Sequence, residues 1–497
     1  MNLRIKPLDD ILATAAKKSL HRSLGAFQLT MLGVGAIIGT GIFVLTSEAA
    51  QKAGPGMMVS FVIAGFVCAV TALCYAEMAS MIPVSGSAYT YSYAVLGEVI
   101  AWIVGWALIL EYAIAGSTVA VGWSGYVVGL LRHLHELLPF LPNVSLPDAW
   151  VLGPFDGGII NVPALIISGL VTWLLVLGTK ESAYVNAILV SIKVIALTVF
   201  CVLALPVMHA QNFVPFAPNG WVGRSFGVSA AAASIFFAYV GFDAVSTCAE
   251  ETKNPNRNIP IGLIGSLLIC TVFYLLVAAG AIGSVGGQPV MGADGMSLEP
   301  GSPELAAACH GLHQLVCSKE PLAFVLRELH FPGIGNLIGL AAGIALPSVI
   351  LMMIYGQTRI FFVMSRDGLL PEKLSTIHPR YRTPHVVTVI TGLFVSFFAA
   401  LFPVGKLADI SNSGTLFAFL VVAAGVMILR IRDPGRRRSF RTPAIWVIGP
   451  LASFGCVYLF FSLSAYTQLL FISWTAFGLV LYMLYGRHHS HHGRAHG

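Results

Sequence analysis

The sequence predicts an all-α integral membrane protein with twelve transmembrane helices, and three observations lead to this fold class. Apolar residues make up 57% of the chain and charged residues only 10%, with a mean hydropathy of +0.82, whereas soluble domains carry about 25% charged residues. Twelve stretches approach the roughly 20 apolar residues that cross the hydrocarbon core. Glycines also interrupt the first of these stretches near its centre.

The expected spans follow one another along the whole chain. They lie near residues 26–50, 57–80, 98–130, 162–178, 184–207, 226–250, 260–284, 335–364, 386–403, 409–430, 443–463 and 467–486. Because a membrane-spanning segment has to satisfy its backbone polar groups internally, each span is expected to be helical. The third span is longer than the bilayer is thick, so it is expected to tilt or to project beyond it.

The first span carries four glycines near its centre, Gly33, Gly35, Gly39 and Gly41. Glycine costs a helix about 1 kcal/mol relative to alanine, and a backbone group freed in hydrocarbon costs several kcal/mol more unless something satisfies it. Transporters place such breaks where bare backbone groups meet a bound solute. A broken first helix therefore predicts a transporter.

The sixth span repeats this pattern, because Gly241 is followed closely by Asp243 in the segment SIFFAYVGFDAV. A carboxylate this deep in a span is costly and by default functional. Interruptions at corresponding positions of two five-span halves indicate an inverted repeat with a binding site at its interface. The alternative is that Gly241 only allows close helix packing.

The backbone groups that two such breaks expose match the two poles of an amino acid. N–H groups that open a half-helix favour a carboxylate, and they are expected at Thr40, Gly41 and Ile42. Carbonyls that end the preceding half-helices would accept hydrogen bonds from an ammonium group. These carbonyls belong to Ala36, Ile37, Phe237, Ala238 and Val240.

Four segments carry a family resemblance, namely GVGAIIGTGIF (33–43), PVSGSAYTYSY (83–93), FAYVGFDAVSTCAEETKNPNRNIP (237–260) and YGQTRIFFVMSRDGLLP (355–371). They resemble the amino acid–polyamine–organocation (APC) superfamily, and the last two are most similar to bacterial members of the cationic amino acid transporter family. The resemblance extends from about residue 20 to residue 485. It implies a LeuT-type 5+5 inverted repeat in which the discontinuous helices 1 and 6 carry the site.

Lys193 is the only lysine inside a span, about 14 Å from the start of the fifth span. Burial makes it easier for a lysine to release its proton. The resemblance implies that Lys193 replaces the coupling cation of sodium-dependent relatives and binds carbonyls near Gly33 and Val34, helped by Ser348. The alternative is a structural lysine, paired with an acid or reaching towards an interface.

Two carboxylates are available to the same pocket, Asp243 and Glu111, the latter about 20 Å into the third span. Two anions in a low-dielectric medium repel each other, so the side chain of lysine, arginine or ornithine would fit between them. Phe237 would cover such a ligand by a cation–π contact, or only pack. Alternatively, Glu111 is protonated or bonded to a hydroxyl group on a neighbouring helix.

The distribution of Lys and Arg predicts that both termini lie in the cytoplasm. With this orientation, 21 of the 28 Lys and Arg residues fall in inner segments and 6 in outer loops, in keeping with the positive-inside rule. Charges at the inner span ends would form gate salt bridges, or act only as topogenic charges and helix caps. They are Glu77, Glu250, Glu251, Lys253, Arg366 and Asp367.

The chain is expected to comprise an N-terminal segment (1–25), a transport core (26–430, including the outer loop 285–334), helices 11 and 12 (443–486) and a His-rich tail (487–497). In the outer loop, Cys309 and Cys317 are expected to form a disulfide because that side is oxidising; two free thiols are the alternative. The tail is expected to be solvated and disordered, with metal binding as the alternative.

The sequence therefore predicts a secondary active transporter in a bacterial inner membrane, with amino acid, proton and lipid bilayer as its partners. It would import amino acids, with cationic ones preferred, by proton symport and alternating access, as a monomer or homodimer. The alternatives are an amino acid or amine exchanger, a broad neutral amino acid permease, a transceptor and a channel. No catalytic residue, cofactor, metal site or nucleic-acid partner is expected, because no nucleophile–base constellation or Walker lysine occurs.

Overall fold

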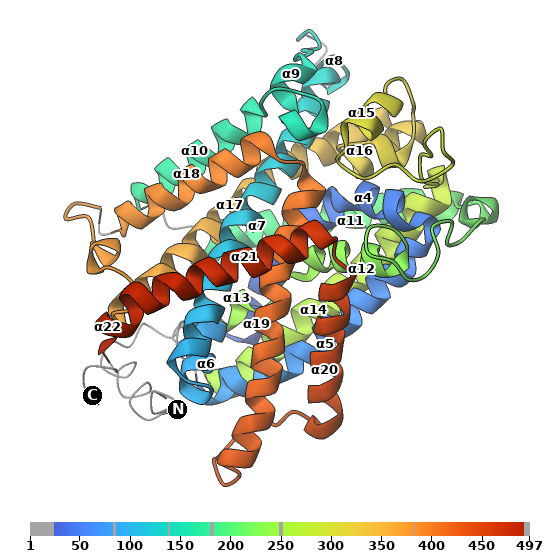
Figure 1. The fold of residues 1–497 in the computed structure, drawn as a ribbon. Helices are drawn as coiled ribbons and strands as arrows, with labels where there is room; N and C mark the ends of the chain where they lie inside the picture. Colours follow the sequence, from blue (N-terminus) through green and yellow to red (C-terminus); the bar gives the residue numbers. More distant parts are fainter. Residues whose placement is uncertain are drawn as a thin grey trace.

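The computed structural model describes residues 24–82, 86–137, 140–178, 183–247, 252–381 and 383–491. Within these ranges the chain is almost entirely helical and contains no β-strand longer than an isolated bridge (Figure 1). The N-terminal segment up to residue 23 and the last six residues lie outside the described residues. The prediction of an all-α protein is confirmed.

The long helices coincide with the apolar stretches of the sequence. They are α5 (Met57–Met81), α7 (Glu98–Arg132), α11 (Ala183–Ala204), α14 (Pro255–Val285), α17 (Pro332–Arg366), α19 (Val404–Arg432), α20 (Ile445–Ser462) and α21 (Ala465–Leu481). Eight helical stretches of the described chain are long and apolar enough to cross a membrane, by length and composition. Four shorter apolar helical stretches, Ala26–Ile37, Val162–Val176, Val228–Tyr239 and His385–Leu401, cover the other predicted spans.

The first predicted span is broken, as its glycines led us to expect. Helix α2 (Ala26–Ile37) ends where Ile38 adopts an extended conformation, with ψ of 96°. Two residues of irregular backbone, Ile38 and Gly39, separate it from the single turn α3 (Thr40–Phe43), and α4 (Leu45–Ala53) continues the span. The chain therefore unwinds at the glycine cluster and then resumes a helical course.

The sixth predicted span is broken in the same way. Helix α12 (Val228–Ile235) passes into a 3-10 turn, η5 (Phe236–Tyr239), after which Val240 is extended with ψ of 136°. Gly241 then has φ of +118°, a conformation that side chains disfavour, and α13 (Ala244–Thr247) follows. The discontinuity predicted from Gly241 is confirmed.

The long helices pack in pairs around these two breaks. Helix α7 packs against α17, α5 against α14, and α10 (Val162–Val176) against α18 (His385–Leu401), as Figure 1 shows for the last pair. Helices α20 and α21 lie outside this group: α20 packs on α19, and α21 crosses α7. Trp102 and Trp106 of α7 fix the latter contact by donating to the carbonyls of Gly478 and Trp474, at 2.8 and 2.9 Å.

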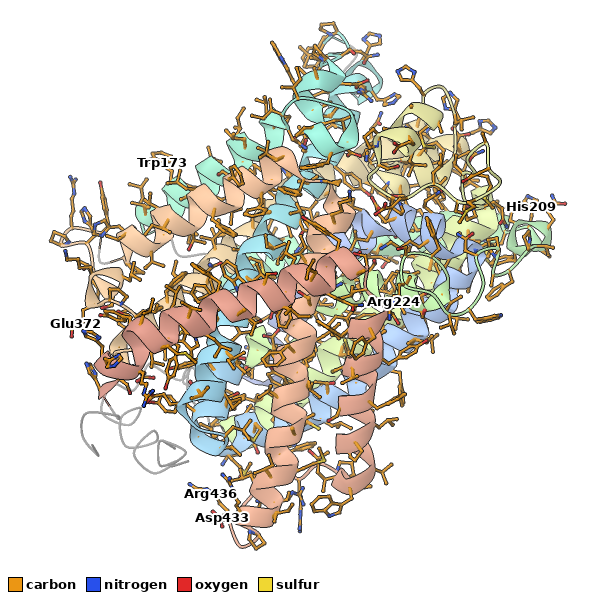
Figure 2. The ribbon with its side chains drawn as sticks, viewed as in Figure 1. Trp173, His209, Arg224, Glu372, Asp433 and Arg436 are labelled. Atoms are coloured by element: carbon orange, nitrogen blue, oxygen red, sulfur yellow. A yellow bond between two sulfur atoms is a disulfide. The ribbon has the colours of Figure 1, made fainter. Side chains whose placement is uncertain are left out.

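Short helices gather at two opposite ends of the molecule. One end, the loop end, holds α8 (Leu134–Leu137), α9 (Asp148–Val151), α15 (Pro303–Ala308) and α16 (Pro321–Glu328); the other, the tail end, holds α6 (Ser87–Val95) and α22 (Arg487–His489). Figure 2 shows His209 and Arg224 towards the loop end and Glu372, Asp433 and Arg436 towards the tail end. Segments predicted to face opposite sides of the membrane thus lie at opposite ends.

The outer loop is folded down onto the helices. Cys309 and Cys317 form a disulfide, which confirms the prediction. Lys319 donates to Asp156 at 2.8 Å, and the Glu320 carboxylate is so close to α7 that a Cβ at Gly129 would lie 2.0 Å from it. The loop therefore covers the ends of several helices instead of extending into solvent.

The described part of the tail is exposed except at one residue. Arg487, His488, His489 and His491 are exposed, as expected of a solvated segment. Ser490 is buried, and its hydroxyl group donates to the Glu98 carboxylate at the start of α7. His491 also donates its backbone N–H to the Asp367 carbonyl at 3.1 Å.

Candidate substrate site

The two broken segments touch each other directly at glycine positions. A Cβ added at Gly41 would lie 2.2 Å from the Cα of Ala238, and one added at Gly241 would lie 2.9 Å from the carbonyl oxygen of Ala36. Real Cβ atoms do not approach other atoms so closely. Gly41 and Gly241 therefore have a packing role as well as a conformational one.

A tyrosine on a neighbouring helix links the two breaks. The Tyr274 hydroxyl of α14 lies 2.9 Å from the Ile37 carbonyl oxygen and 2.8 Å from that of Ala238. A phenol has one proton to donate, so it satisfies one carbonyl at a time and leaves the other available to a ligand. The sequence analysis missed Tyr274, although a tyrosine in the apolar span 260–284 is itself a signal, because a buried hydroxyl group needs a partner.

A small cavity lies where the breaks meet. It is lined by residues of both breaks and of two further helices: Ala36, Ile37, Gly39, Thr40, Gly41, Val119, Phe237, Val240, Val349 and Met353. Its free volume is about 10 Å³, which is room for about one water molecule. An amino acid therefore enters only if the lining segments move apart.

The cavity joins polar backbone to apolar side chains. Among the described residues, no backbone hydrogen bond uses the N–H groups of Thr40, Gly41 or Ile42, and the buried Thr40 hydroxyl group has no partner. The side chains that α7 and α17 contribute, including Val119 and Val349, are apolar. Six of the ten predicted substrate residues line the cavity, while Ile42 and Ala238 flank it in the same turns.

The two predicted carboxylates are not among the described residues that line the cavity. Glu111 faces α19 instead: its Cβ would lie 3.4 Å from a Cβ at Gly414, and the Ser411 hydroxyl group donates to its backbone carbonyl. Neither Glu111 carboxylate oxygen has a hydrogen-bond partner in the described part of the chain. Asp243 accepts a hydrogen bond from the Tyr112 hydroxyl at 3.2 Å. The structure does not bring the pair to the cavity wall.

Lys193 is buried and bonds the broken first helix, although at a different carbonyl from the predicted ones. Its Nζ donates to the Gly35 carbonyl oxygen at 2.9 Å. The Val34 carbonyl is already used by the N–H of Ile38, and Gly33 faces α14, where its Cβ would lie 2.5 Å from the Ser266 hydroxyl oxygen. Lys193 thus ties α11 to the last turn of α2, just before the break.

Ser348 donates its hydroxyl proton to the Ala345 carbonyl of its own helix at 2.8 Å. Its oxygen can still accept a hydrogen bond, which is what an ammonium group would need from it. The assistance of Ser348 to Lys193 stays a prediction.

A buried polar cluster fastens the half-helices on the loop-end side of the breaks. Lys52 of α4 forms an ion pair with Asp409 of α19 at 3.0 Å, and Ser234 of α12 hydrogen-bonds to both. All three residues are buried. The cluster joins one half of each broken span to α19; it was not predicted, because Lys52 lies beyond the end of the first predicted span, 26–50.

The charges at the tail end are paired differently from the predicted gate. Glu77 accepts two hydrogen bonds from Arg430, both at 2.7 Å, and lies 3.1 Å from Arg438. Asp367 accepts from the Tyr89 hydroxyl at 2.8 Å, while Glu250 and Glu251 lie outside the described residues. Glu77 is fully buried, so its ion pairs hold a loop in place and are not a surface contact that opens easily.

The sequence of this chain is similar to those of known permeases and transporters. Residues 24–485 match the amino acid permease family. A branched-chain amino acid permease, BcaP of Bacillus subtilis (strain 168), is 43% identical over 98% of both chains. A methylthioribose transporter of the same organism is 39% identical, again over 98% of both chains. Cationic amino acid transporter 9 (chloroplastic) of Arabidopsis thaliana is 38% identical over 85% of this chain and 68% of its own.

Proposed function

The chain belongs to the amino acid permease family, and from this premise we propose that it transports neutral amino acids with apolar side chains, coupled to protons. The observation that carries the substrate class is the cavity between the two breaks. Its side-chain wall is formed by residues such as Phe237, Val349 and Met353, and neither predicted carboxylate lines it. The name of the Bacillus subtilis branched-chain permease supports the same class. This proposal replaces the cationic preference expected from the sequence with the neutral alternative.

Recognition of the amino acid backbone rests on the breaks themselves. The N–H groups of Thr40, Gly41 and Ile42 would bind the carboxylate, because a half-helix that begins there places its positive dipole end at the cavity. The carbonyl that Tyr274 leaves unpaired would accept from the ammonium group. Because the Tyr274 hydroxyl group reaches both carbonyls, it would donate to the one that the ammonium group does not bind.

Alternating access requires two halves that move relative to each other. We propose twelve spans with a 5+5 inverted repeat, in which α5, α7 and α10 of the first half correspond to α14, α17 and α18 of the second. What supports the repeat is that each of these three pairs packs together, as the members of two interlocked halves would. We also propose that the tail end faces the cytoplasm, because the sequence places its basic residues there.

Lys193 is the group that we propose as the proton carrier. Charged, it bonds the Gly35 carbonyl and holds α2 against α11. Without the proton, its ammonium charge is lost and the contact weakens, which would free the break to open. Its nearly complete burial supports this role, because a buried ammonium is stable only while it is well paired.

The experiment that tests the substrate class is a thermal-shift measurement on the purified protein at pH 5.5 and 7.5. Leucine, isoleucine and valine would be compared with lysine, arginine and ornithine. A ligand at 100 times its dissociation constant adds about 2.7 kcal/mol of stability. We expect the three apolar amino acids to raise the melting temperature; a shift with the cationic ones alone would reject the proposal.

Proton coupling is tested by leucine uptake into proteoliposomes with and without an inwardly directed proton gradient. We expect the gradient to accelerate uptake by the wild type and by the exposed-residue control Lys373→Gln, and not by Lys193→Gln. Equal gradient dependence of both variants would remove Lys193 from the coupling role. Uptake that needs amino acid inside the vesicles, whatever the gradient, would instead identify an exchanger.

Cationic amino acids remain a second candidate because the relatives include several cationic amino acid transporters. Glu111 is the group that would then have to act, since it is buried with both carboxylate oxygens unpartnered in the described chain. The same thermal-shift panel decides between the two classes. Stabilisation by arginine that is lost in Glu111→Gln would identify cationic amino acids as the substrates.

A further inference from the structure

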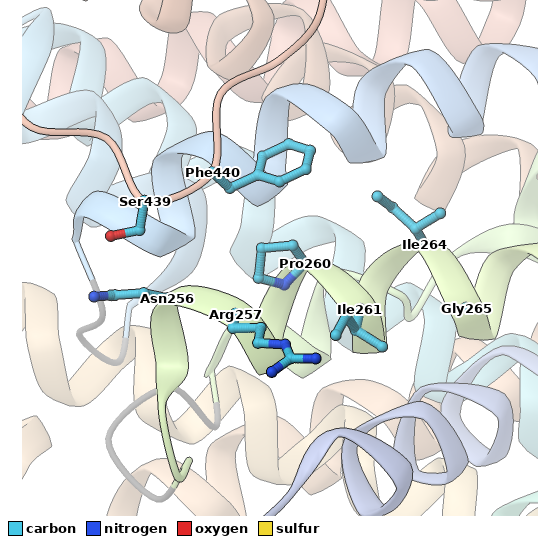
Figure 3. A pocket seen from close by; sticks show the side chains of 8 residues that line it. All are labelled: Asn256, Arg257, Pro260, Ile261, Ile264, Gly265, Ser439 and Phe440. Atoms are coloured by element: carbon cyan, nitrogen blue, oxygen red, sulfur yellow. The ribbon is translucent and has the colours of Figure 1, made fainter.

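A large groove lies at the tail end, far from the cavity between the breaks. Its volume is about 670 Å³, and it is bounded by the first three turns of α14 and by the segment that connects α19 to α20. In Figure 3, Ser439 and Phe440 of that connection lie above Asn256 and Pro260 of the helix, and the Arg257 side chain extends below the helix in this view. No residue of the groove has a part in the transport cycle described above.

The lining changes from polar to apolar along the helix. Arg257 and Asn256 lie in the first turn of α14, and Ser439 of the connection lines the same groove. Ile261 and Ile264, one and two turns further along, form the apolar part. From Arg257 to Ile264 the helix rises by about 10 Å. The groove therefore offers hydrogen-bond donors at its outer part and hydrocarbon contacts towards the membrane.

The apolar part opens onto the side of the helix that faces the lipid. Ile261 is 42% exposed and Leu268, seven residues further along α14, is 66% exposed. Residues seven apart lie on the same face of a helix. A chain that left the groove past Ile264 would thus continue along this exposed apolar face into the bilayer.

The polar part carries positive charge that no described residue neutralises. The Arg257 side chain is exposed and makes no hydrogen bond or ion pair in the described chain. The connection that holds Ser439 also contains Arg437 and Arg441, which are both exposed. Guanidinium groups bind phosphate oxygens with two parallel hydrogen bonds, and basic residues beside a span attract anionic lipids.

We propose that this groove binds an anionic phospholipid, with its phosphate at Arg257, Asn256 and Ser439 and one acyl chain along Ile261 and Ile264. The amphiphilic lining selects a lipid over a soluble phosphate, because a soluble ligand would leave the apolar half exposed. At Gly265 the helix packs closely on α2, because a Cβ there would lie 3.3 Å from Thr30.

Native mass spectrometry of the full chain in detergent tests the proposal by titration with three probes. They are phosphatidylglycerol, phosphatidylcholine with the same acyl chains, and glycerol 3-phosphate. We expect phosphatidylglycerol to bind at least about fivefold more tightly than phosphatidylcholine, and glycerol 3-phosphate not to compete with it. Equal affinity for the two lipids would overturn the proposal, and full competition by glycerol 3-phosphate would overturn its choice of a lipid.

Two variants and one control locate the site. Arg257→Gln is expected to reduce the preference for phosphatidylglycerol about fivefold, and Ile264→Trp to weaken both lipids by filling the apolar half. Arg380→Gln removes another exposed arginine outside the groove and is expected to bind like the wild type. Size-exclusion profiles and melting temperatures check that each variant is folded. Unchanged lipid binding by folded Arg257→Gln would reject the groove as the site.

Discussion

The contact between the two broken spans can be tested with one added methyl group, in the variant Gly41→Ala. The new Cβ would lie 2.2 Å from the Ala238 Cα and 2.5 Å from its Cβ. Non-bonded carbon atoms prefer about 3.5–4.0 Å, so α3 and η5 would have to separate by more than about 1 Å. The substitution thus perturbs the cavity without changing a polar group.

The structure sets the size of the expected effect. Overpacking of a tight contact costs about 1–3 kcal/mol. Replacing glycine with alanine in a helix gains at most about 1 kcal/mol, and less at Gly41 because α3 is only a four-residue turn. We therefore expect Gly41→Ala to be destabilised by about 1–2 kcal/mol. Its leucine uptake should fall strongly, because the breaks could no longer close around the substrate.

A matched control is available on α7. Gly116 is also a buried helical glycine, but its added Cβ would lie 3.5 Å from the nearest atom, a Cγ of Val395. This is ordinary contact, so Gly116→Ala should be neutral or slightly stabilised and should transport normally. Both variants would be compared by thermal unfolding in one detergent and by uptake into proteoliposomes. A Gly41→Ala protein as stable and active as the control would show that the breaks do not touch.

Three further predictions follow from buried polar groups. Tyr274→Phe should lower stability by about 1–3 kcal/mol, measured by thermal unfolding, because a buried carbonyl loses its hydrogen-bond donor; an unchanged melting temperature would contradict the link. Glu77→Gln should lower stability by about 3–5 kcal/mol in the same assay, since two buried guanidinium groups lose their counter-charge. The more exposed pair of Asp433 and Arg436 (Figure 2) serves as the control, and Asp433→Asn should lower stability by at most about 1 kcal/mol. Burial raises the pKa of Glu320 in the outer loop to about 7, against the influence of the adjacent arginine. The folded state therefore holds this proton more tightly than the unfolded state does. Stability should be lost as the pH rises from about 4.5 to 7. Melting temperatures across this range should fall less steeply in Glu320→Gln, and parallel curves would refute the assignment.

The first-helix break illustrates what local sequence can predict. The cost of Gly33, Gly35, Gly39 and Gly41 to a helix is a property of the chain itself, so the position of the unwound segment follows without knowledge of its neighbours. The same holds for Gly241, whose positive φ is available to glycine at little cost. The disulfide in the outer loop was also predictable, since its two cysteines lie eight residues apart.

Lys193 illustrates the boundary between what the sequence predicts and what only the tertiary structure shows. Its burial follows from the apolar span around it, and its approach to the first break was expected from the family resemblance. The carbonyl that it contacts is that of Gly35, because the last turn of α2 uses the Val34 carbonyl internally. The sequence thus predicts the partner helix and misses the partner atom by one residue.

What the sequence by itself determined is the set of apolar spans, the two breaks and the burial of Lys193, because hydropathy and glycine content act within a segment. What only the tertiary structure decided is the direction in which each side chain points. Successive residues of a helix point about 100° apart, so a modest rotation of α7 about its axis turns Glu111 from the cavity towards α19. That rotation is set by packing between helices distant in sequence, and it is the reason that the cavity wall is apolar.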